Sequence, residues 1–216
     1  MKCIVTAGPT SEPLDEVRCL TNLSTGRLGS ELANHLAARG HLVTLLLGRG
    51  ATFHTTLAAQ RVERFTTTAD LRSSLVSMSD PSVGAVFHAA AVSDFAFGRV
   101  FRGRAGGVLT ECRERKISTA EEGLLAELIA TPKLLDGLRA WFPQARLVGW
   151  KYEAQGDPAW VVAQARAQIT RGRTDACVAN GPAYGTGFGL IVGDGACRHL
   201  PDTPALCEAL AEWLRG

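Results

Sequence analysis

The sequence predicts an α/β protein with a Rossmann-like three-layer fold and a mostly parallel sheet. Short apolar runs alternate with amphipathic segments along the chain, and 46% of the 216 residues are apolar against 20% charged. Strands of parallel sheets form near-continuous apolar runs because helices cover both faces of the sheet. At this length we expect one domain spanning 1–216, with an insertion described below.

The first half of the chain alternates apolar runs with helical patterns. "CIVTAG" predicts a buried strand that stops at the turn Gly8-Pro9. A helix is expected next, with Ser24 or Thr25 as N-cap and Gly40 at its end, because Leu28, Leu32, Ala33 and Leu36 share one helical face. Two strands are expected next, from "LVTLLLG" and "RVERFT". A helix over residues 68–77 and a strand from "GAVFHAAAV" follow them.

The second half continues the same alternation. Thr131-Pro132 predicts the start of a helix, and "RLVGW" predicts a strand. Asp157-Pro158 predicts a second helix start and Thr203-Pro204 a third. "DACVAN" is typical of a buried strand, and "FGLIV" is expected to pair with it at the sheet edge.

A basic segment at about 97–118, rich in glycine and without a clear period, interrupts this alternation as an insertion. The whole chain carries a net charge of only +2, yet this segment holds a surplus of basic residues: Arg99, Arg102, Arg104, Arg113, Arg115 and Lys116 against Glu111 and Glu114. Two interpretations stay open at this point, a solvated basic loop and a flap that covers a polyanionic substrate.

Several classes of protein are excluded or disfavoured. The net charge is too small to indicate a nucleic-acid-binding protein, and no apolar run approaches the ~18 residues of a membrane helix, so we expect a cytoplasmic protein without nucleic-acid or membrane partners. The six cysteines are scattered and are expected to be reduced. Walker A and Gly-x-Ser-x-Gly patterns are absent, and His88 inside an apolar run indicates a hydrogen-bonded core residue.

Polar and small residues gather where three expected strands end. Ligands of open α/β sheets bind beyond the carboxyl ends of strands, near helix N-termini. Gly8 and Gly26 let a phosphate approach the backbone, Ala90 and Ala91 leave room for a ligand, and Asp94 is a candidate Mg²⁺ ligand. "ANGPAYGTGFG" follows the third of these strands. A capped helix entry and ordinary turns would explain the same residues.

The three strand ends together resemble one known family. "TAGPTSEPLDEVRCLTNLSTGRLG" is similar to the opening signature of phosphopantothenate–cysteine ligases. "HAAAVSDF", "RKIS", "TPKLL", "VGW" and "DACVANG" follow in the family's order, and the similarity covers nearly the whole chain. It implies a standalone ligase without the flavin decarboxylase domain found in many bacteria, so no FMN site is expected.

The resemblance implies a reaction and its partners. The family joins 4′-phosphopantothenate to cysteine in coenzyme A biosynthesis: the carboxylate first attacks the α-phosphate of a nucleoside triphosphate, and the cysteine amine then displaces the nucleotide. Mg²⁺ is an expected cofactor, CTP the expected nucleotide with ATP as the alternative, and a homodimer the expected assembly. "WKYE" resembles ATP-using eukaryotic relatives, whereas "STGRLG" resembles bacterial ones.

By the same resemblance, Asn22 handles the acyl intermediate and Lys116 is the flap lysine that stabilises the transferring phosphoryl group. The other implied contacts are with nucleotide, phosphate or metal: Ser24, Thr25 and Gly26 at the helix N-terminus, Asp94 with Mg²⁺, Pro132, Lys133, Leu134 and Leu135 in one loop, and Trp150 near the base. Where relatives often carry a lysine before the "DLIVAN" strand, this chain has Arg171-Gly172-Arg173.

Two other functions stay open. "GRLGSELANHLAARGHLVTLLLGR" resembles the cofactor helix and following strand of a short-chain NADP-dependent reductase, although almost twenty residues separate Ala7 from Gly26 and no Tyr-x-x-x-Lys is present. The third possibility is a paralogue that binds nucleotide or phosphopantothenate without turnover.

Overall fold

The computed structural model describes residues 1–103, 106–112, 114–118, 123–193 and 195–216, so Arg104 and Arg113 of the basic segment lie outside the described residues. The central sheet has eight strands in the order β13-β12-β11-β10-β6-β1-β4-β5. These strands are β1 Lys2–Ala7, β4 Leu42–Gly48, β5 Arg61–Phe65, β6 Val83–His88, β10 Arg146–Tyr152, β11 Ala176–Asn180, β12 Phe188–Val192 and β13 Arg198–Leu200.

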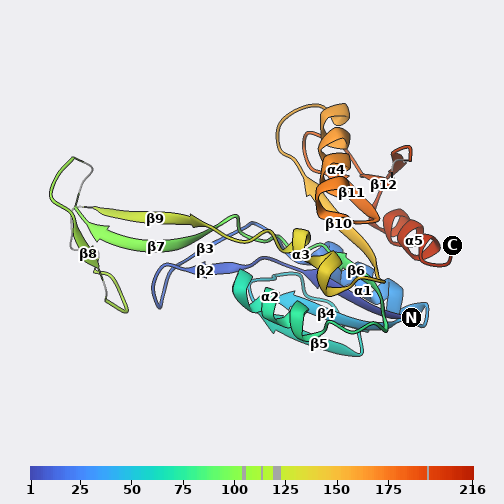
Figure 1. The fold of residues 1–216 in the computed structure, drawn as a ribbon, viewed down its shortest axis with the longest axis horizontal. Coiled ribbons are helices and arrows are strands. Elements are labelled where there is room, and N and C mark those ends of the chain that lie inside the picture. The colour runs from blue at the N-terminus through green and yellow to red at the C-terminus, as the bar shows by residue number, and fades with distance from the viewer. Residues whose placement is uncertain (104–105, 113, 119–122, 194) are drawn as a thin grey trace.

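Six neighbouring strands of this sheet run parallel, namely β11, β10, β6, β1, β4 and β5. The remaining two, β12 and β13, pair antiparallel. Two helices pack on one face and three on the other, which confirms the predicted α/β fold (Figure 1). The first face carries α1 Arg27–Ala38 and α5 Thr203–Trp213, and the second carries α2 Thr68–Ser77, α3 Leu134–Trp141 and α4 Pro158–Gly172.

The apolar runs of the sequence form the core between these layers. Val5 and Phe87 point to the α1–α5 face and Ile4 and Val86 to the α2–α3 face, all almost fully buried. Because successive side chains of a strand alternate between faces, a strand covered on both sides needs apolar residues throughout. This alternation is the physical reason that the continuous runs predicted the sheet.

A second body of strands projects from the sheet as an arm (Figure 1). The arm is a three-stranded antiparallel sheet of β7 Phe95–Arg102, β8 Thr110–Cys112 and β9 Leu124–Ala130. Beside it runs a hairpin of β2 Ser11–Pro13 and β3 Cys19–Thr21. The predicted insertion at 97–118 is therefore wrong in its bounds: the inserted structure starts at Phe95, and β9 closes it at Ala130.

Two helix starts and two strand assignments also differ from the expectations. Gly26, in a left-handed conformation, takes the N-cap position of α1 in place of Ser24 or Thr25, and α3 begins at Leu134 rather than beside Thr131-Pro132. The run 84–92 leaves the sheet after His88. The strand "FGLIV" is not at the edge, because β13 pairs with its outer side.

All six cysteines are free, and Cys3, Cys177 and Cys207 are buried. Burial raises the pKa of the Cys177 and Cys207 thiols to about 12, so both stay protonated. Within the described part of the chain, no helix is long and apolar enough to cross a membrane.

His88 is a hydrogen-bonded core residue, as its place in an apolar run indicates. Its Nδ1 lies 3.0 Å from the Thr6 hydroxyl, which itself accepts the N–H of Ala90 at 3.1 Å. The neutral ring is hydrogen-bonded to this hydroxyl, and its tautomer determines which of the two groups donates. Burial lowers the pKa of His88 to about 4.

We expect the free energy of unfolding to decrease as the pH falls from about 6.5 to about 4. In this window His88 takes up a proton in the unfolded chain but not in the folded one. The free energy of unfolding therefore decreases by about 2–4 kcal/mol between the two pH values. Urea unfolding at several pH values measures this loss. His88→Gln keeps a hydrogen-bonding group without titrating, and an equally steep pH dependence in that variant would contradict the assignment.

Candidate functional site

The connections of the sheet define a crevice at one edge. From β1 the chain moves outward through β4 to β5, then returns to add β6 on the other side of β1. The loops that follow β1 and β6 therefore diverge, and ligands of open α/β sheets bind at such a reversal. The carboxyl ends of β1 and β6 are the place where a ligand is expected.

Gly8 and Gly26 meet at the floor of this crevice. Both have left-handed backbones, with φ of 77° and 79°, and a Cβ on Gly26 would lie 3.4 Å from Gly8 Cα. It would also lie 2.9 Å from the Cβ of Ala51, so a side chain has no space there. Glycine is required at Gly26 both by conformation and by close approach.

The α1 N-terminus opens beside these glycines. The N-cap residue, Gly26, has no side chain with which to cap the helix, and among the first N–H groups of α1 that of Arg27 donates to Thr25 Oγ1 at 3.3 Å. The Thr25 carbonyl is used instead by the loop after β4, which donates the N–H groups of Thr52 and Phe53 to it. The Thr25 side chain is exposed and that of Ser24 half-buried, and an uncapped helix N-terminus suits an anion.

The loops after β1 and β6 are joined backbone to backbone. Ala91 donates its N–H to the Gly8 carbonyl at 3.0 Å and accepts the N–H of Thr10 at 3.1 Å, while Ala90 donates to Thr6. The N–H groups of both alanines are thus occupied within the protein. Ala90 and Ala91 contribute the small side chains that the sequence predicted, and their amides do not serve a phosphate.

Asn22 lies at the same crevice. Its Nδ2 donates to the carbonyl of Val92 at 3.1 Å, which connects the chain after β3 with the loop after β6. The residue is otherwise exposed. This single hydrogen bond brings an amide from the α1 approach next to the Asp94 segment.

Asp94 and Lys133 form an ion pair, so two predicted nucleotide-site residues far apart in sequence meet here. The Thr131 N–H also donates to the Asp94 carbonyl at 3.0 Å. The Thr131 hydroxyl donates to the Ser93 carbonyl at 2.5 Å, and Lys133 takes the N-cap position of α3. The Asp94 side chain is 66% exposed. An exposed carboxylate offers the kind of oxygen donor that Mg²⁺ prefers.

The remaining residues of the predicted α3 loop have different positions. Leu134 is buried and Leu135 packs beside it against Gly149, so both side chains belong to the core. Pro132 is exposed next to Lys133. Contacts of the two leucines with a ligand would have to come from their backbone.

Trp150 lies in the carboxyl-terminal half of β10, two residues before its last residue, Tyr152. In the register of the sheet its neighbour Gly149 faces His88, and the Trp150 ring packs partly buried against the α1–α5 core. Within the described residues its buried Nε1 has no hydrogen-bond partner. The ring therefore lies on the α1–α5 side of the sheet with a buried donor that has no partner among the described residues.

Lys116 does not join this group within one chain. The segment Arg115–Ile117 is hydrogen-bonded to the hairpin loop around Asp15 and Arg18, on the projecting arm rather than at the crevice. The Lys116 side chain is exposed, and the described structure gives it no hydrogen bond or ion pair. The structure thus brings together the predicted residues from four loops and leaves the flap lysine apart from them.

Arg171 and Arg173 do not replace a crevice cation. They end α4, just before β11 begins, and so lie at the amino edge of the sheet, where Arg171 pairs with Asp136 at 3.4 Å. The sequence did not single out Lys151, which follows Trp150 at the carboxyl edge and pairs with Glu153 at 2.8 Å. Lys151 comes directly after the predicted strand "RLVGW", and that position was the available signal, although β10 extends through Tyr152.

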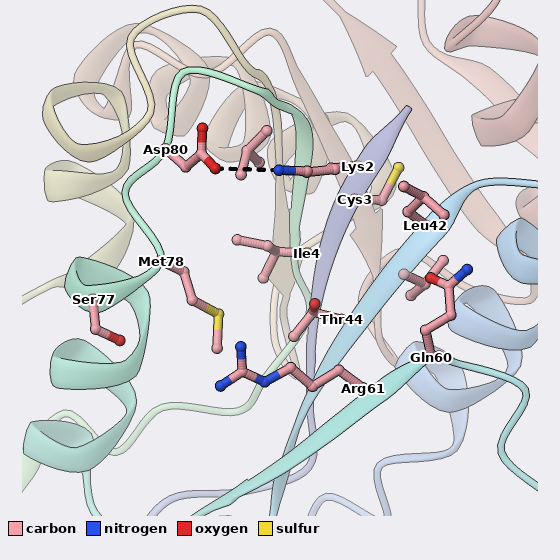
Figure 2. A pocket seen from close by; sticks show the side chains of 12 residues that line it. Lys2, Cys3, Ile4, Leu42, Thr44, Gln60, Arg61, Ser77, Met78 and Asp80 are labelled. Atoms are coloured by element: carbon pink, nitrogen blue, oxygen red, sulfur yellow. Dashed lines mark hydrogen bonds and ion pairs between the residues drawn. The ribbon is translucent and has the colours of Figure 1, made fainter.

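A pocket of about 410 Å³ lies at the opposite edge of the sheet (Figure 2). The amino ends of β1, β4 and β5 line it together with Met78 after α2, and the ion pair of Lys2 with Asp80 at 3.3 Å bounds one side (Figure 2). None of the predicted site residues lines it. The pocket is therefore separate from the crevice described above.

The fold and the crevice define a class: a Rossmann-like α/β protein with a candidate ligand site at the switch point and a projecting β-arm. The model for the DNA/pantothenate metabolism flavoprotein C-terminal domain matches residues 1–191. The chain belongs to this family.

Relatives of known function are similar over most of the chain. The coenzyme A biosynthesis bifunctional protein CoaBC of Thermococcus kodakarensis is 31% identical over 93% of this chain and 47% of its own length. The protein of the same name in Bacillus subtilis is 31% identical over 92% and 46%. The chain thus spans about half the length of these relatives.

Solved structures share the fold. The DNA/pantothenate metabolism flavoprotein from Streptococcus pneumoniae matches with a TM-score of 0.86 and 26% identity, over 100% of this chain and 98% of that one. A Cab2 H337A mutant in complex with phosphopantothenate-cysteine matches with a TM-score of 0.70 and 16% identity, over 99% and 87%. The latter likeness concerns the fold alone.

Proposed function

We propose that this protein is a phosphopantothenate–cysteine ligase that acts in coenzyme A biosynthesis. The observation that carries the proposal is the convergence of four loops, 8–10, 22–26, 90–94 and 131–133, at the carboxyl ends of β1 and β6. These loops hold the residues by which the sequence resembles the ligase family. The CoaBC relatives support the assignment.

In the first step, a carboxylate oxygen of 4′-phosphopantothenate attacks the α-phosphorus of the nucleoside triphosphate. Pyrophosphate leaves with the electrons of the broken P–O bond, and an acyl-nucleotide anhydride forms. The triphosphate lies against Gly26 and the uncapped α1 N-terminus, where a helix dipole favours negative charge. Lys116 stabilises the charge that develops on the transferring group.

In the second step, the cysteine amine attacks the acyl carbon, nucleoside monophosphate leaves and an amide forms. The Asn22 amide lies at the crevice with its Nδ2 bound to Val92 and its oxygen available to the intermediate. Asp94, beside Lys133, would hold Mg²⁺, which when bound offsets the negative charge of the phosphates.

We propose a homodimer in which the arm of one protomer reaches the crevice of its partner. Phe95, Leu128 and Ile129 on the arm are each about half exposed, at 45%, 51% and 52%. Exposed apolar side chains that are close together favour association with another surface. An arm that serves a neighbouring crevice also explains why Lys116 lies far from the crevice of its own chain.

The proposal is tested by incubating the protein with Mg²⁺, 4′-phosphopantothenate and cysteine, and with CTP or ATP in separate reactions. We expect pyrophosphate release and amide product with CTP, ATP being the alternative nucleotide. If neither nucleotide yields pyrophosphate, the ligase proposal is rejected. Nucleotide binding by calorimetry without product would instead identify a non-catalytic paralogue.

The reductase alternative has no support in the geometry. The dinucleotide fingerprint requires a tight turn from the first strand into the helix. Here the β2–β3 hairpin occupies that connection between Ala7 and Arg27. We therefore keep only the ligase as a catalytic proposal.

Asn22→Asp is expected to separate the two steps. Aspartate cannot donate to the Val92 carbonyl, and its charge repels that oxygen, so the side chain loses the hydrogen bond that holds it at the crevice. We expect pyrophosphate release within about threefold of the wild type, but amide formation lowered about 10²-fold with the acyl-nucleotide accumulating. Quenched reactions analysed by chromatography measure both. Leu23→Ala, at a fully exposed neighbour, is the control, and equal loss of both steps in Asn22→Asp would contradict the assigned role.

A further inference from the structure

The signature stretch Glu12–Arg18 has no role in the function proposed above. In the structure Glu12 and Pro13 end β2, and residues 14–18 form the loop of the β2–β3 hairpin. Two charged side chains of this loop, Asp15 and Arg18, reach across to the segment that carries Lys116.

The two oxygens of the Asp15 carboxylate accept hydrogen bonds from two different segments, the hairpin loop and Ile117. Oδ1 accepts the N–H groups of Val17 at 3.0 Å and Arg18 at 2.9 Å, which builds the hairpin loop. Oδ2 accepts the N–H of Ile117 at 3.1 Å and the Nε of Arg18 at 3.1 Å. The Asp15 side chain is only 1% exposed, and the Arg18 guanidinium holds the pKa of this carboxyl well below its usual range.

The same arginine completes the hold on Ile117. Its Nη2 donates to the Ile117 carbonyl at 2.7 Å, so one ion pair binds both polar backbone atoms of that residue. The Ile117 side chain is 4% exposed. On the other side of Lys116, the Arg115 carbonyl accepts the N–H of Glu16 at 2.9 Å.

Lys116 therefore sits between two residues whose backbones are anchored to the hairpin. Its side chain points into solvent from a fixed main chain. A lysine has a long flexible stem, so the region that its ammonium samples is set by where its Cα is held. A shift of about 1 Å at a reacting centre is enough to lower a rate about 10²-fold.

We propose that Asp15, together with Arg18, positions the Lys116 ammonium for the step that releases pyrophosphate, through the backbone of Ile117. This inference rests on the proposed ligase function. It assigns Asp15 as a positioning residue, which acts on the same chain's Lys116 whichever protomer's crevice that lysine enters. The hairpin thus sets the geometry of the arm.

Asp15→Asn tests the inference selectively. The single amide oxygen replaces Oδ1 and keeps the hairpin loop, whereas the NH₂ group faces the donors of Ile117 and Arg18 and cannot accept from them. We expect kcat for pyrophosphate release to decrease about 10–100-fold, with KM for both substrates changed less than about threefold. Amide hydrogen exchange of residues 115–117 is expected to accelerate.

A double-mutant cycle separates positioning from general damage. In a Lys116→Ala background, Asp15→Asn is expected to change the single-turnover rate by less than about twofold, because nothing remains to be positioned. A loss of the same factor in the Lys116→Ala background as in the wild-type background would overturn the inference. Wild-type kcat or unchanged exchange of 115–117 in Asp15→Asn would also overturn it.

The control is Glu16→Gln, which removes an exposed ion pair with Arg115, 2.6 Å long, from the same loop without touching Ile117. We expect its kcat and exchange to match the wild type. Absence of pyrophosphate release in the wild type rejects the ligase proposal itself. If the wild type is active but Asp15→Asn lowers the rate by the same factor with and without Lys116, only the role of Asp15 is rejected.

Discussion

Lys116→Ala is expected to lower the rate of pyrophosphate release about 10²–10³-fold, because it removes the positive charge at which the transferring phosphoryl group is stabilised. The fold should be unaffected, since Lys116 is exposed and has no partner within the described structure. Single-turnover pyrophosphate assays measure the change, and thermal unfolding checks the fold. A rate within a few-fold of the wild type would show that another group supplies the charge.

The matched control is Arg115→Ala. It removes an equal charge from the neighbouring residue, whose guanidinium pairs with Glu16 and is 89% exposed. Surface ion pairs of this kind contribute little to stability. We expect nearly wild-type rates, so that a defect in Lys116→Ala reflects that lysine and not the total charge of the arm.

Mixing Lys116→Ala with Asp94→Asn protein tests which crevice the arm serves. If the arm serves the partner's crevice, each mixed dimer contains one intact site, and about a quarter of the wild-type activity returns after subunit exchange. If the arm serves its own chain, no site in the mixture is intact and the activity stays at the level of the separate variants. The same result would be seen if the protein did not dimerise.

Gly26→Ala is expected to destabilise the protein by about 2–5 kcal/mol and to weaken nucleotide binding. An L-residue in the left-handed region costs about 1–2 kcal/mol, and overpacking adds about 1–3 kcal/mol. The overpacking arises because the new Cβ would lie 2.9 Å from Ala51 Cβ and 3.2 Å from Leu47 Cδ1. Denaturant unfolding and the KM for nucleotide measure the two effects.

Gly40→Ala measures the conformational cost alone, and the difference between the two variants gives the cost of the close contact at Gly26. Gly40 has a φ of 81°, close to that of Gly26, but a Cβ there would meet no atom within 4 Å. We therefore expect only the conformational cost of about 1–2 kcal/mol and an unchanged KM. Equal destabilisation by both substitutions would mean that the contact of Gly26 with the loop after β4 relaxes easily.

The strands of the arm could not be predicted from sequence patterns. In β7 the pairing with β9 shifts register between Phe97 and Val100, and this irregularity breaks the alternation by which a strand is recognised. In β9, "LLAELIA" consists mostly of residues that favour helices. Pairing across the arm decides its structure, so the sequence analysis assigned no element to 124–130.

The site was predictable in part. Gly8, Gly26 and Asp94 were singled out because they lie near strand ends, and Asn22 and Lys133 by the family resemblance. The structure joins all five at one crevice. That Ala90 and Ala91 use their amides internally could not be foreseen, because backbone partners leave no trace in residue type. The roles of these residues in catalysis stay predictions.

The sequence alone determined the layered α/β fold, helix 68–77 and the buried hydrogen-bonded His88, because burial imposes a periodicity that residue types reveal locally. Only the tertiary structure decided that Asp15 and Arg18 hold Ile117, that Asp94 meets Lys133 and that Gly26 replaces a side-chain cap. These features depend on main-chain atoms and on contacts between distant segments. Such contacts form only when the whole sheet brings its loops together.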